Sequence, residues 1–226
     1  MLKKIFLTAL VLVTFSTLTN LYAQKIELGF KGGVNISNAT LDPAPPSEVT
    51  KKARVGMIFG ALAEFNVAQS FYLQPEVEYI NKGLKMEGTY TGGSFTSVSR
   101  IDYLQIPVYA KFKFVNKKSP FMPYLFAGPV LGFNLKSEAE VTQTVLGSGG
   151  TSTTTTTTTD NKSETESIEF GLNFGLGAEL RVAPKVGIFI SGLYNLGLTN
   201  INKSSTDTTK IKNNGINIFA GVKFGI

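Results

Sequence analysis

The sequence predicts an all-β protein, a single eight-stranded antiparallel transmembrane β-barrel. Two observations lead to this fold class. Apolar and polar residues alternate with a period of two in eight separate segments, which is the pattern of strands with one apolar face. The connections between the segments are short and long in turn, as expected of a barrel with short periplasmic turns and long extracellular loops.

The eight segments account for most of the chain. The predicted strands cover residues 25–36, 54–66, 71–82, 103–114, 123–135, 168–182, 186–198 and 216–226. The alternation is clearest in residues 168–182, where apolar residues occupy the even positions and Gly, Asn or charged residues the odd ones. Each segment is long enough to cross a bilayer, since a tilted strand needs about 9–11 residues. Short connections are expected at 67–70, 115–120 and 183–185, and long loops at 37–53, 83–102, 136–167 and 199–215.

Residues 1–23 are predicted to form a cleaved signal peptide. Lys3 and Lys4 give it a positive start, and the apolar stretch from Ile5 to Leu18 is too short and too often interrupted by Thr and Ser to span a membrane. Cleavage is expected after Ala23, which leaves residues 24–226 as one outer-membrane barrel domain. The later segments hold no run of 18 apolar residues, so the sequence argues against a helical membrane protein.

The composition limits the chemistry that the chain could perform. It has 226 residues with no Cys, His or Trp, and 22 Lys and Arg against 16 Asp and Glu. The sequence therefore offers no thiolate nucleophile, disulfide, imidazole base or imidazole metal ligand. We expect a protein that is not an enzyme and that has no cofactor, metal site or catalytic residues. Nucleic acid is not an expected partner, because the strands lack a continuous basic face.

The charged residues of the strands fall on one face, opposite the apolar one. An eight-stranded barrel is barely wide enough for its own interior side chains, and unpaired buried charge costs several kcal/mol per ion. We therefore expect a closed network of ion pairs in the interior and no open channel. The predicted interior polar network consists of Glu27, Lys31, Arg54, Glu64, Glu76, Glu78, Lys82, Lys111, Lys113, Glu169, Glu179, Arg181 and Lys223.

Two acidic residues in this set, Glu76 and Glu78, lie two positions apart on one face of their strand. Such a spacing suits a carboxylate pair for acid–base chemistry or an oxygen site for calcium. The preferred interpretation is structural. It pairs the two carboxylates with basic residues on flanking strands, namely Arg54, Lys82, Lys111 or Lys113. Glu179 is expected to pair with Arg181 in the same way.

Aromatic residues, glycines and prolines add three expectations for the strands. Two aromatic girdles are expected, one at the short-turn rim (Phe65, Phe71, Phe112, Phe114, Phe121, Tyr124 and Phe224) and one toward the other rim (Tyr79, Tyr103, Phe133, Phe170 and Tyr194). Glycines at strand spacing are expected to provide interior space and curvature. Proline lacks a donor for the strand ladder, and β-bulges are one way to accommodate Pro75, Pro107 and Pro129.

The third long loop contains the run Thr153 to Thr159 after Gly149 and Gly150. Such a segment cannot bury a core, so it is expected to be a mobile, low-complexity surface loop. A ligand-binding loop is the alternative.

Six stretches spread over the chain resemble a known family. They are GFKGGVN at 29–35, LQPEVEY at 73–79, YLQIPVYAKFK at 103–113, PYLFAGPVLG at 123–132, YNLGLTNI at 194–201 and GVKF at 221–224. In order and spacing they resemble the PorT-like outer-membrane β-barrel proteins of Bacteroidetes. The resemblance implies export, insertion by the outer-membrane assembly machinery and a C-terminal strand that serves as the insertion signal. Asp207, Thr208 and Thr209 also resemble the short O-glycosylation motif of Bacteroidetes.

These features together predict a non-enzymatic protein of the outer membrane. Its role is expected to be structural, or to lie in interactions through the outer loops, and the resemblance adds the hypothesis of an accessory of type IX secretion. The expected partners are outer-membrane lipid and lipopolysaccharide, the assembly machinery, and envelope or secretion-machine proteins. Two alternatives remain open: a soluble lipocalin-like carrier with its apolar face inward, and a narrow pore.

Overall fold

The computed structural model describes residues 26–116, 118–147, 149, 151–205 and 207–226, and the predicted signal peptide lies outside these residues. They form ten strands and one short 3-10 helix. These are β1 (Ile26–Asp42), β2 (Val49–Asn66), β3 (Phe71–Lys82), β4 (Leu84–Tyr90), β5 (Gly93–Lys113), β6 (Phe121–Leu146), β7 (Ser152–Asp160), η2 (Lys162–Glu164), β8 (Ile168–Ala183), β9 (Val186–Gly197) and β10 (Lys210–Gly225). No helix within these residues has the length and hydropathy needed to cross a bilayer.

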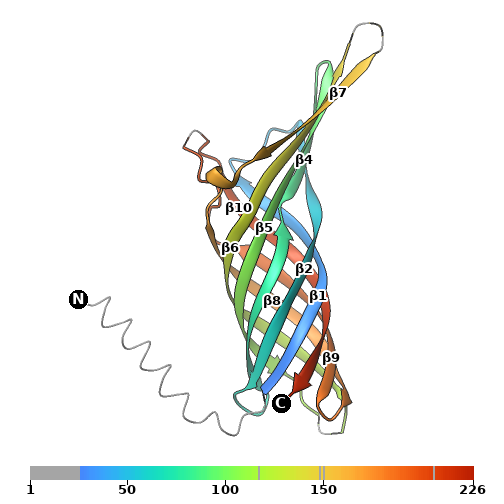
Figure 1. The fold of residues 1–226 in the computed structure, drawn as a ribbon, viewed down its shortest axis with the longest axis vertical. Helices are drawn as coiled ribbons and strands as arrows, with labels where there is room; N and C mark the ends of the chain where they lie inside the picture. The colour runs from blue at the N-terminus through green and yellow to red at the C-terminus, as the bar shows by residue number, and fades with distance from the viewer. Residues whose placement is uncertain (1–25, 117, 148, 150, 206) are drawn as a thin grey trace, which may run out of the picture.

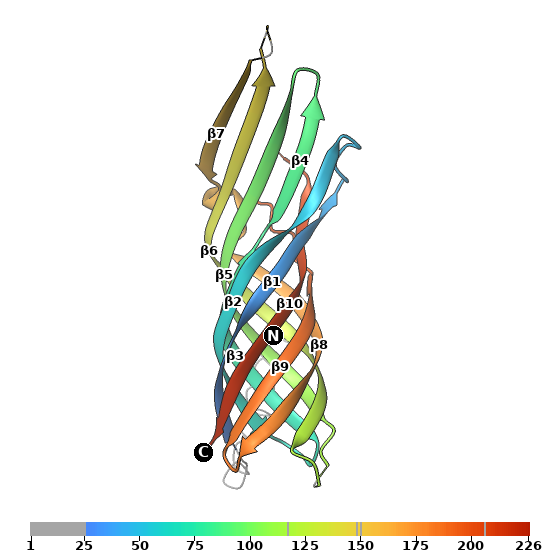
Figure 2. The ribbon, with the colours of Figure 1, turned by 90° about the vertical axis from the view of Figure 1, so that its right-hand side faces the viewer.

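Eight of the strands form a closed antiparallel ring (Figures 1 and 2). Around the ring the order is β1, β2, β3, β5, β6, β8, β9 and β10. β10 then pairs with β1 along its whole length, from Glu27 opposite Gly225 to Asp42 opposite Lys210. The prediction of an all-β antiparallel fold is confirmed. Each of the eight alternating segments corresponds to one strand of the ring, and the segment 71–82 coincides with β3.

The prediction that residues 83–102 and 136–167 form loops is wrong. β4 and β7 lie inside these segments, and β5 and β6 continue into them. The Thr run, expected to be a mobile loop, forms β7. A long connection must satisfy its backbone hydrogen bonds, and β-branched Thr favours the extended conformation, so pairing into a sheet meets both demands.

These added strands form a sheet that stands beyond one end of the ring (Figure 2). We call it the extension, and it consists of residues 49–53 of β2, all of β4, 93–100 of β5, 138–146 of β6 and all of β7. Its strands pair in the order β2, β4, β5, β6, β7. The short connections 67–70, 114–116 with 118–120, and 184–185 lie at the opposite end, which we call the short-turn rim (Figure 1).

The ring is apolar outside and polar inside. Phe30, Val55 and Leu176 are each more than 60% exposed on the outer face, whereas Lys223 and Glu179 are completely buried. Aromatic side chains fill the remaining interior. Tyr109, Tyr124, Phe126, Phe189 and Phe219 belong to one buried cluster.

Two members of the predicted aromatic girdles point inward. Tyr103 is 0% and Tyr124 2% exposed, which corrects their assignment to the outer surface. Their positions in the alternation place them on the inner face, where each hydroxyl finds a partner. The hydroxyl of Tyr124, for example, lies 2.6 Å from the Ser191 hydroxyl.

The three prolines are accommodated without a shift of register. Val108 of β5 lies opposite Pro75 of β3. Between β5 and β6 the pairing stops at Pro107 opposite Val130 and resumes at Ala110 opposite Ala127, so it skips Pro129. The register is the same before and after each gap, so the ladder is interrupted locally and no bulge is needed at these positions. The bulge interpretation was therefore wrong. The irregularities of register lie elsewhere, at Asp102/Tyr103 and Arg181/Ala183.

Candidate functional site

The interior charges gather in three clusters along the axis of the ring. The basal cluster lies nearest the short-turn rim and consists of Glu27, Glu64, Lys111, Lys113, Glu179, Arg181 and Lys223. The middle cluster consists of Lys31, Glu76 and Glu78, and the upper cluster is built around Lys82 and Glu169. Twelve of the thirteen residues of the predicted interior network thus form ion pairs in the ring.

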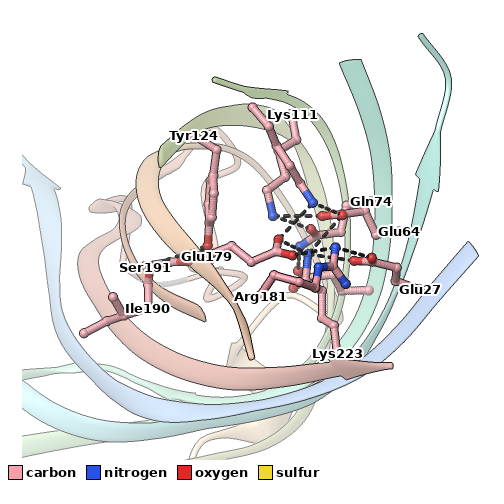
Figure 3. Close-up of polar contacts among 12 residues, drawn as sticks. Glu27, Glu64, Gln74, Lys111, Tyr124, Glu179, Arg181, Ile190, Ser191 and Lys223 are labelled. Atoms are coloured by element: carbon pink, nitrogen blue, oxygen red, sulfur yellow. Dashed lines mark hydrogen bonds and ion pairs between the residues drawn. The ribbon is translucent and has the colours of Figure 1, made fainter. Parts of the chain in front are cut away.

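Lys223 is the centre of the basal cluster (Figure 3). Its Nζ contacts Glu179 and lies 2.9 Å from Glu64 Oε1 and 3.2 Å from Glu27 Oε2. Lys113 bridges two of the same glutamates, at 2.9 Å from Glu179 Oε2 and in contact with Glu64. Each carboxylate therefore faces more than one cation, and each of these two lysines faces more than one carboxylate.

Further contacts close the basal cluster on both sides. Arg181 donates to Glu27 at 2.5 Å and pairs with Glu179 at 3.0 Å, as the sequence predicts for the latter pair. Lys111 pairs with Glu64 at 2.9 Å, and its Nζ lies 3.7 Å from the centre of the Tyr124 ring, within cation–π range. The cluster thus joins residues of β1, β2, β5, β8 and β10.

Glycine neighbours give Lys223 the space that its side chain needs. In the register of the ring, Lys223 lies between Gly29 on β1 and Gly187 on β9. A Cβ atom on Gly29 would lie 2.8 Å from Lys223 Cγ, and one on Gly187 would lie 2.8 Å from Glu179 Oε1. Larger residues at either glycine would displace the ion pairs.

In the middle cluster, a glycine again provides the space that a lysine side chain needs. Lys31, Gly60 and Glu78 occupy one row of the sheet on β1, β2 and β3. Because Gly60 has no side chain, Lys31 crosses it to reach Glu78 at 2.5 Å, and its Nζ also contacts Glu76. Gln74 donates to the other oxygen of Glu76 at 2.5 Å.

The upper cluster combines one ion pair with amides. Lys82 Nζ lies 2.9 Å from Glu169 Oε1 and 3.0 Å from Asn195 Oδ1. Asn213 donates to the second oxygen of Glu169 at 3.1 Å. With its amide nitrogen turned toward Glu78, Gln105 links this cluster to the middle one, since it donates to Glu78 at 3.1 Å and accepts from Lys82 at 2.9 Å.

The structure corrects the predicted partners of Glu76 and Glu78. Both carboxylates pair with Lys31, whereas Lys82 pairs with Glu169, and Lys111 and Lys113 pair with Glu64. Arg54 is partly buried and donates to the backbone carbonyl of Lys82 at 3.0 Å. The sequence argument assumed partners on flanking strands, but a long Lys side chain can reach across a glycine to the next strand.

The carboxylates are poorly placed for acid–base or metal chemistry. Glu76 and Glu78 have fully buried side chains in contact with Lys31, so a substrate or a calcium ion would have to displace that lysine. Glu27, Glu64 and Glu179 have oxygens within 4.8 Å of one another, a spacing that could hold a metal ion. Lys223 is paired with all three, and Lys111, Lys113 and Arg181 supply the further positive charges that balance the three carboxylates.

The predicted interior network left out the uncharged polar residues. Gln74, Gln105, Asn173, Asn195 and Asn213 are all at most 5% exposed. They form the chain of hydrogen bonds that joins the charged groups. Asn195, for example, donates to Asn173 at 2.6 Å, and Asn173 donates to the Tyr109 hydroxyl at 2.8 Å. Their place on the inner side of the alternation was the available signal.

A cavity of about 240 Å³ lies between the extension and the connection from β9 to β10. Its wall combines apolar residues such as Leu84 and Met86 with polar ones from η2 and the connection. Asn213 forms part of the lining and also donates to Glu169, so the upper cluster lies next to this cavity.

The outer face of the extension carries exposed charges. Glu87 on β4 accepts hydrogen bonds from Lys52 and Lys85, with Nζ to oxygen distances of 2.5 and 2.6 Å. These two lysines lower the pKa of the Glu87 carboxyl to about 2. The same face forms a shallow pocket lined by Thr50, Lys52, Glu87 and Thr96, among others.

Comparison with solved structures finds 61 similar chains, among them three outer-membrane proteins. A major outer membrane protein from Thermus thermophilus is 10% identical, with 91% of this chain and 100% of that chain covered and a TM-score of 0.49. OprG from Pseudomonas aeruginosa is 12% identical (90% and 95% covered, TM-score 0.47). Neisserial surface protein A is 17% identical (88% and 96% covered, TM-score 0.44).

The family follows from a comparison with family models. No curated protein matches the chain. The family model described as outer membrane protein beta-barrel domain matches residues 22–203, which is most of the chain. The apolar outer surface and the charged interior of the ring agree with that description. The chain therefore belongs to the outer membrane protein beta-barrel domain family.

Proposed function

We propose that the chain is a non-enzymatic integral protein of the outer membrane, an eight-stranded barrel that carries the extension on the outside of the cell. One observation carries the proposal: the ring reverses the polarity of a soluble protein. Its outer face is apolar, and its charged residues are buried and paired inside. Such a surface is suited to lipid, because every strand of a closed ring also has its backbone groups paired.

The height of the apolar surface fits a bilayer. A strand of 12 residues such as β3 is about 40 Å long at about 3.3 Å per residue, and a tilt near 45° reduces its height to roughly 28 Å. The apolar band of outer-membrane barrels is about 25 Å tall. Membrane lipid and lipopolysaccharide are therefore the proposed partners of the outer face, and the assembly machinery is the proposed partner during insertion.

The buried ion pairs support a closed interior. Glu64, Lys113, Glu179 and Lys223 are at most 1% exposed, although a water-filled pore through the ring would leave them in contact with solvent. This packing argues against the alternative of a narrow pore. It also keeps the carboxylates away from any substrate, which supports a non-enzymatic role.

The orientation of the apolar residues argues against the lipocalin-like alternative. A carrier of that kind needs an apolar cavity inside its barrel. In this ring the inner face carries the ion pairs and amides, whereas Leu28, Phe30 and Val34 point outward. The part of the molecule that remains free for contacts is the extension, so we place the interaction role there.

Fractionation and gel mobility test this proposal together. We expect the protein in the outer-membrane fraction, with a band whose mobility changes on boiling because the closed ring resists detergent. Reconstituted into a planar bilayer, the same preparation is expected to give no stepwise conductance. A soluble periplasmic protein without a mobility change would contradict the membrane assignment, and regular conductance steps would contradict the closed interior.

A narrower role in type IX secretion is a second hypothesis. It rests on the PorT-like stretches in the sequence, two of which, 73–79 and 103–113, lie in the neighbouring strands β3 and β5. Deletion of the gene is then expected to stop the export of type IX cargo while the outer membrane stays intact. Normal export in the deletion strain would remove this hypothesis and leave the barrel assignment unchanged.

A further inference from the structure

β7 is the last strand of the extension, and its outer edge is open. Within the residues that the structure describes, β7 pairs with β6 on one side and with no other strand. All nine of its residues are exposed. Figure 1 shows the β6–β7 hairpin reaching farther from the ring than any other drawn strand pair. Its free N–H and C=O groups therefore face solvent at the outermost part of the extension.

From residue 152 to residue 159, this edge lacks the features that usually prevent strand pairing. Natural edge strands are protected by charged side chains, proline or bulges. Residues 152–159 contain only Ser and Thr, and the register with β6 runs without a break from Glu138 opposite Asp160 to Leu146 opposite Ser152. Thr also has a high preference for strands. The edge is therefore a template for another strand.

The sequence of β7 favours a second copy of itself as that strand. An antiparallel pair of two β7 strands centred on Thr156 places Thr opposite Thr at every position from Thr153 to Thr159. Thr–Thr pairs across strands are favourable, and β7 already forms such pairs with β6. Thr142 and Thr156, and Thr144 and Thr154, form hydroxyl–hydroxyl hydrogen bonds of 3.0 Å between β6 and β7. No charge in residues 152–159 opposes the pairing.

We propose that β7 pairs with β7 of a second copy of this chain and that this pairing joins two membranes. A two-fold axis that makes a strand antiparallel to its copy is perpendicular to the strand. Two copies in one membrane are related by an axis along the membrane normal, which would require β7 to lie in the membrane plane, whereas β7 rises obliquely away from the end of the ring (Figures 1 and 2). Antiparallel pairing therefore suits molecules that face each other from opposite membranes. The inference rests on the proposed function, because it needs the extension outside the membrane.

Clustering of proteoliposomes tests the pairing. The full chain is reconstituted into phosphatidylcholine vesicles, and light scattering follows their clustering. Wild-type vesicles are expected to cluster. The double variant Thr155→Lys/Thr157→Lys is expected to abolish clustering, because each Lys lies opposite a Lys of the other copy and like charges directly opposite oppose pairing. A mixture of these vesicles with vesicles of Thr155→Glu/Thr157→Glu is expected to cluster again.

The matched control places the same charges away from the edge. Ser94→Lys/Thr96→Lys adds two lysines to β5, which has a paired strand on both sides, and is expected to cluster as the wild type does. Any one of three results would overturn the inference. These are wild-type vesicles that stay dispersed, vesicles of the 155/157 lysine variant that cluster, and a mixture of Lys and Glu vesicles that stays dispersed. All vesicles are first checked for a heat-dependent gel shift. A missing shift identifies a failure of the barrel assignment, whereas a normal shift with dispersed wild-type vesicles identifies a failure of strand pairing alone.

Discussion

The interior of the ring is organised around single lysines that each serve several carboxylates. Lys223 is the clearest case, because it contacts Glu27, Glu64 and Glu179 and is 0% exposed. Removing Lys223 would take one cation from each of these three buried carboxylates, and the loss of a partner from a buried ion network costs more than the pair contributes. The position of Lys223 between two glycines means that no neighbouring side chain in its row can take over its role.

The variant Lys223→Met should therefore destabilise the protein strongly. We expect a loss of about 3–5 kcal/mol in the free energy of unfolding, the usual cost of breaking a buried pair. Urea unfolding in lipid vesicles measures it, followed by tyrosine fluorescence, since the chain has no Trp. Lys185→Met, at an exposed position in the turn before β9, is the matched control and should change stability by less than about 0.5 kcal/mol. Equal stability of the two variants would contradict the role of Lys223.

The glycine rows give a second prediction at the level of single residues. Gly60→Val should destabilise the ring by at least about 1–3 kcal/mol, the usual cost of overpacking, because a Cβ there would lie 2.5 Å from the Val77 carbonyl oxygen and 2.8 Å from Glu78 Cβ. Gly32→Val is the control, since Gly32 points outward with nothing within 4 Å of its Cβ position. Urea unfolding should separate the two variants. A Gly60→Val protein as stable as Gly32→Val would show that Lys31 does not need the space.

Among the elements, the pairing of β2 with β4 is expected to weaken at low pH. The carboxyl of Glu87 has a pKa of about 2, below its ordinary value of 4.5, because Lys52 and Lys85 donate to it. The ionised form is favoured in the folded extension, so its stabilising effect is complete above pH 4.5 and is lost as the pH falls toward 2. Carboxyl NMR titration of the protein in detergent should give a midpoint near 2. Lys52→Met should raise that midpoint, and a wild-type midpoint near 4.5 would contradict these hydrogen bonds.

The ring strands could be predicted from the sequence because one face of each meets a different environment from the other. Residues 168–182 alternate with a period of two in the sequence, and β8 has the same alternation between its outer and inner faces. This alternation also places Glu169 and Glu179 on the inner face. The partners of the charges could not be predicted in this way. Lys31 reaches Glu78 across Gly60, and this contact depends on the register of three strands, which alternation within one strand does not define.

The extension was missed for a different reason. Both faces of β7 are exposed, so its residues show no alternation, and a run of Thr has the composition of a surface loop. Its strand character comes from pairing with β6, which is a contact between segments that the sequence pattern does not record. The strand propensity of Thr was the one local signal. The low complexity of the Thr run favoured a surface loop instead.

At the scale of the whole molecule, the ring and the outer part of the extension have separate sources of stability. The ring is closed by hydrogen bonds all around and filled by the ion clusters. The upper half of the β6–β7 hairpin takes no part in the closure of the ring or in the ion clusters, since residues 152–160 are exposed along their whole length. A change confined to the tip of the hairpin should therefore leave the ring intact.

Shortening this hairpin tests that separation. Thr142 and Thr156 lie opposite each other in the register, so replacing residues 143–155 by Asn-Gly joins them through a two-residue turn. We expect an unchanged urea midpoint and an unchanged gel shift on boiling, because no interior ion pair is touched. Vesicle clustering should be lost, because the replacement removes Thr153–Thr155, which lie opposite Thr157–Thr159 of the second copy in the proposed pairing. A shortened protein that no longer shows the gel shift would mean that the ring needs the hairpin to close, and continued clustering would assign adhesion to another part of the extension.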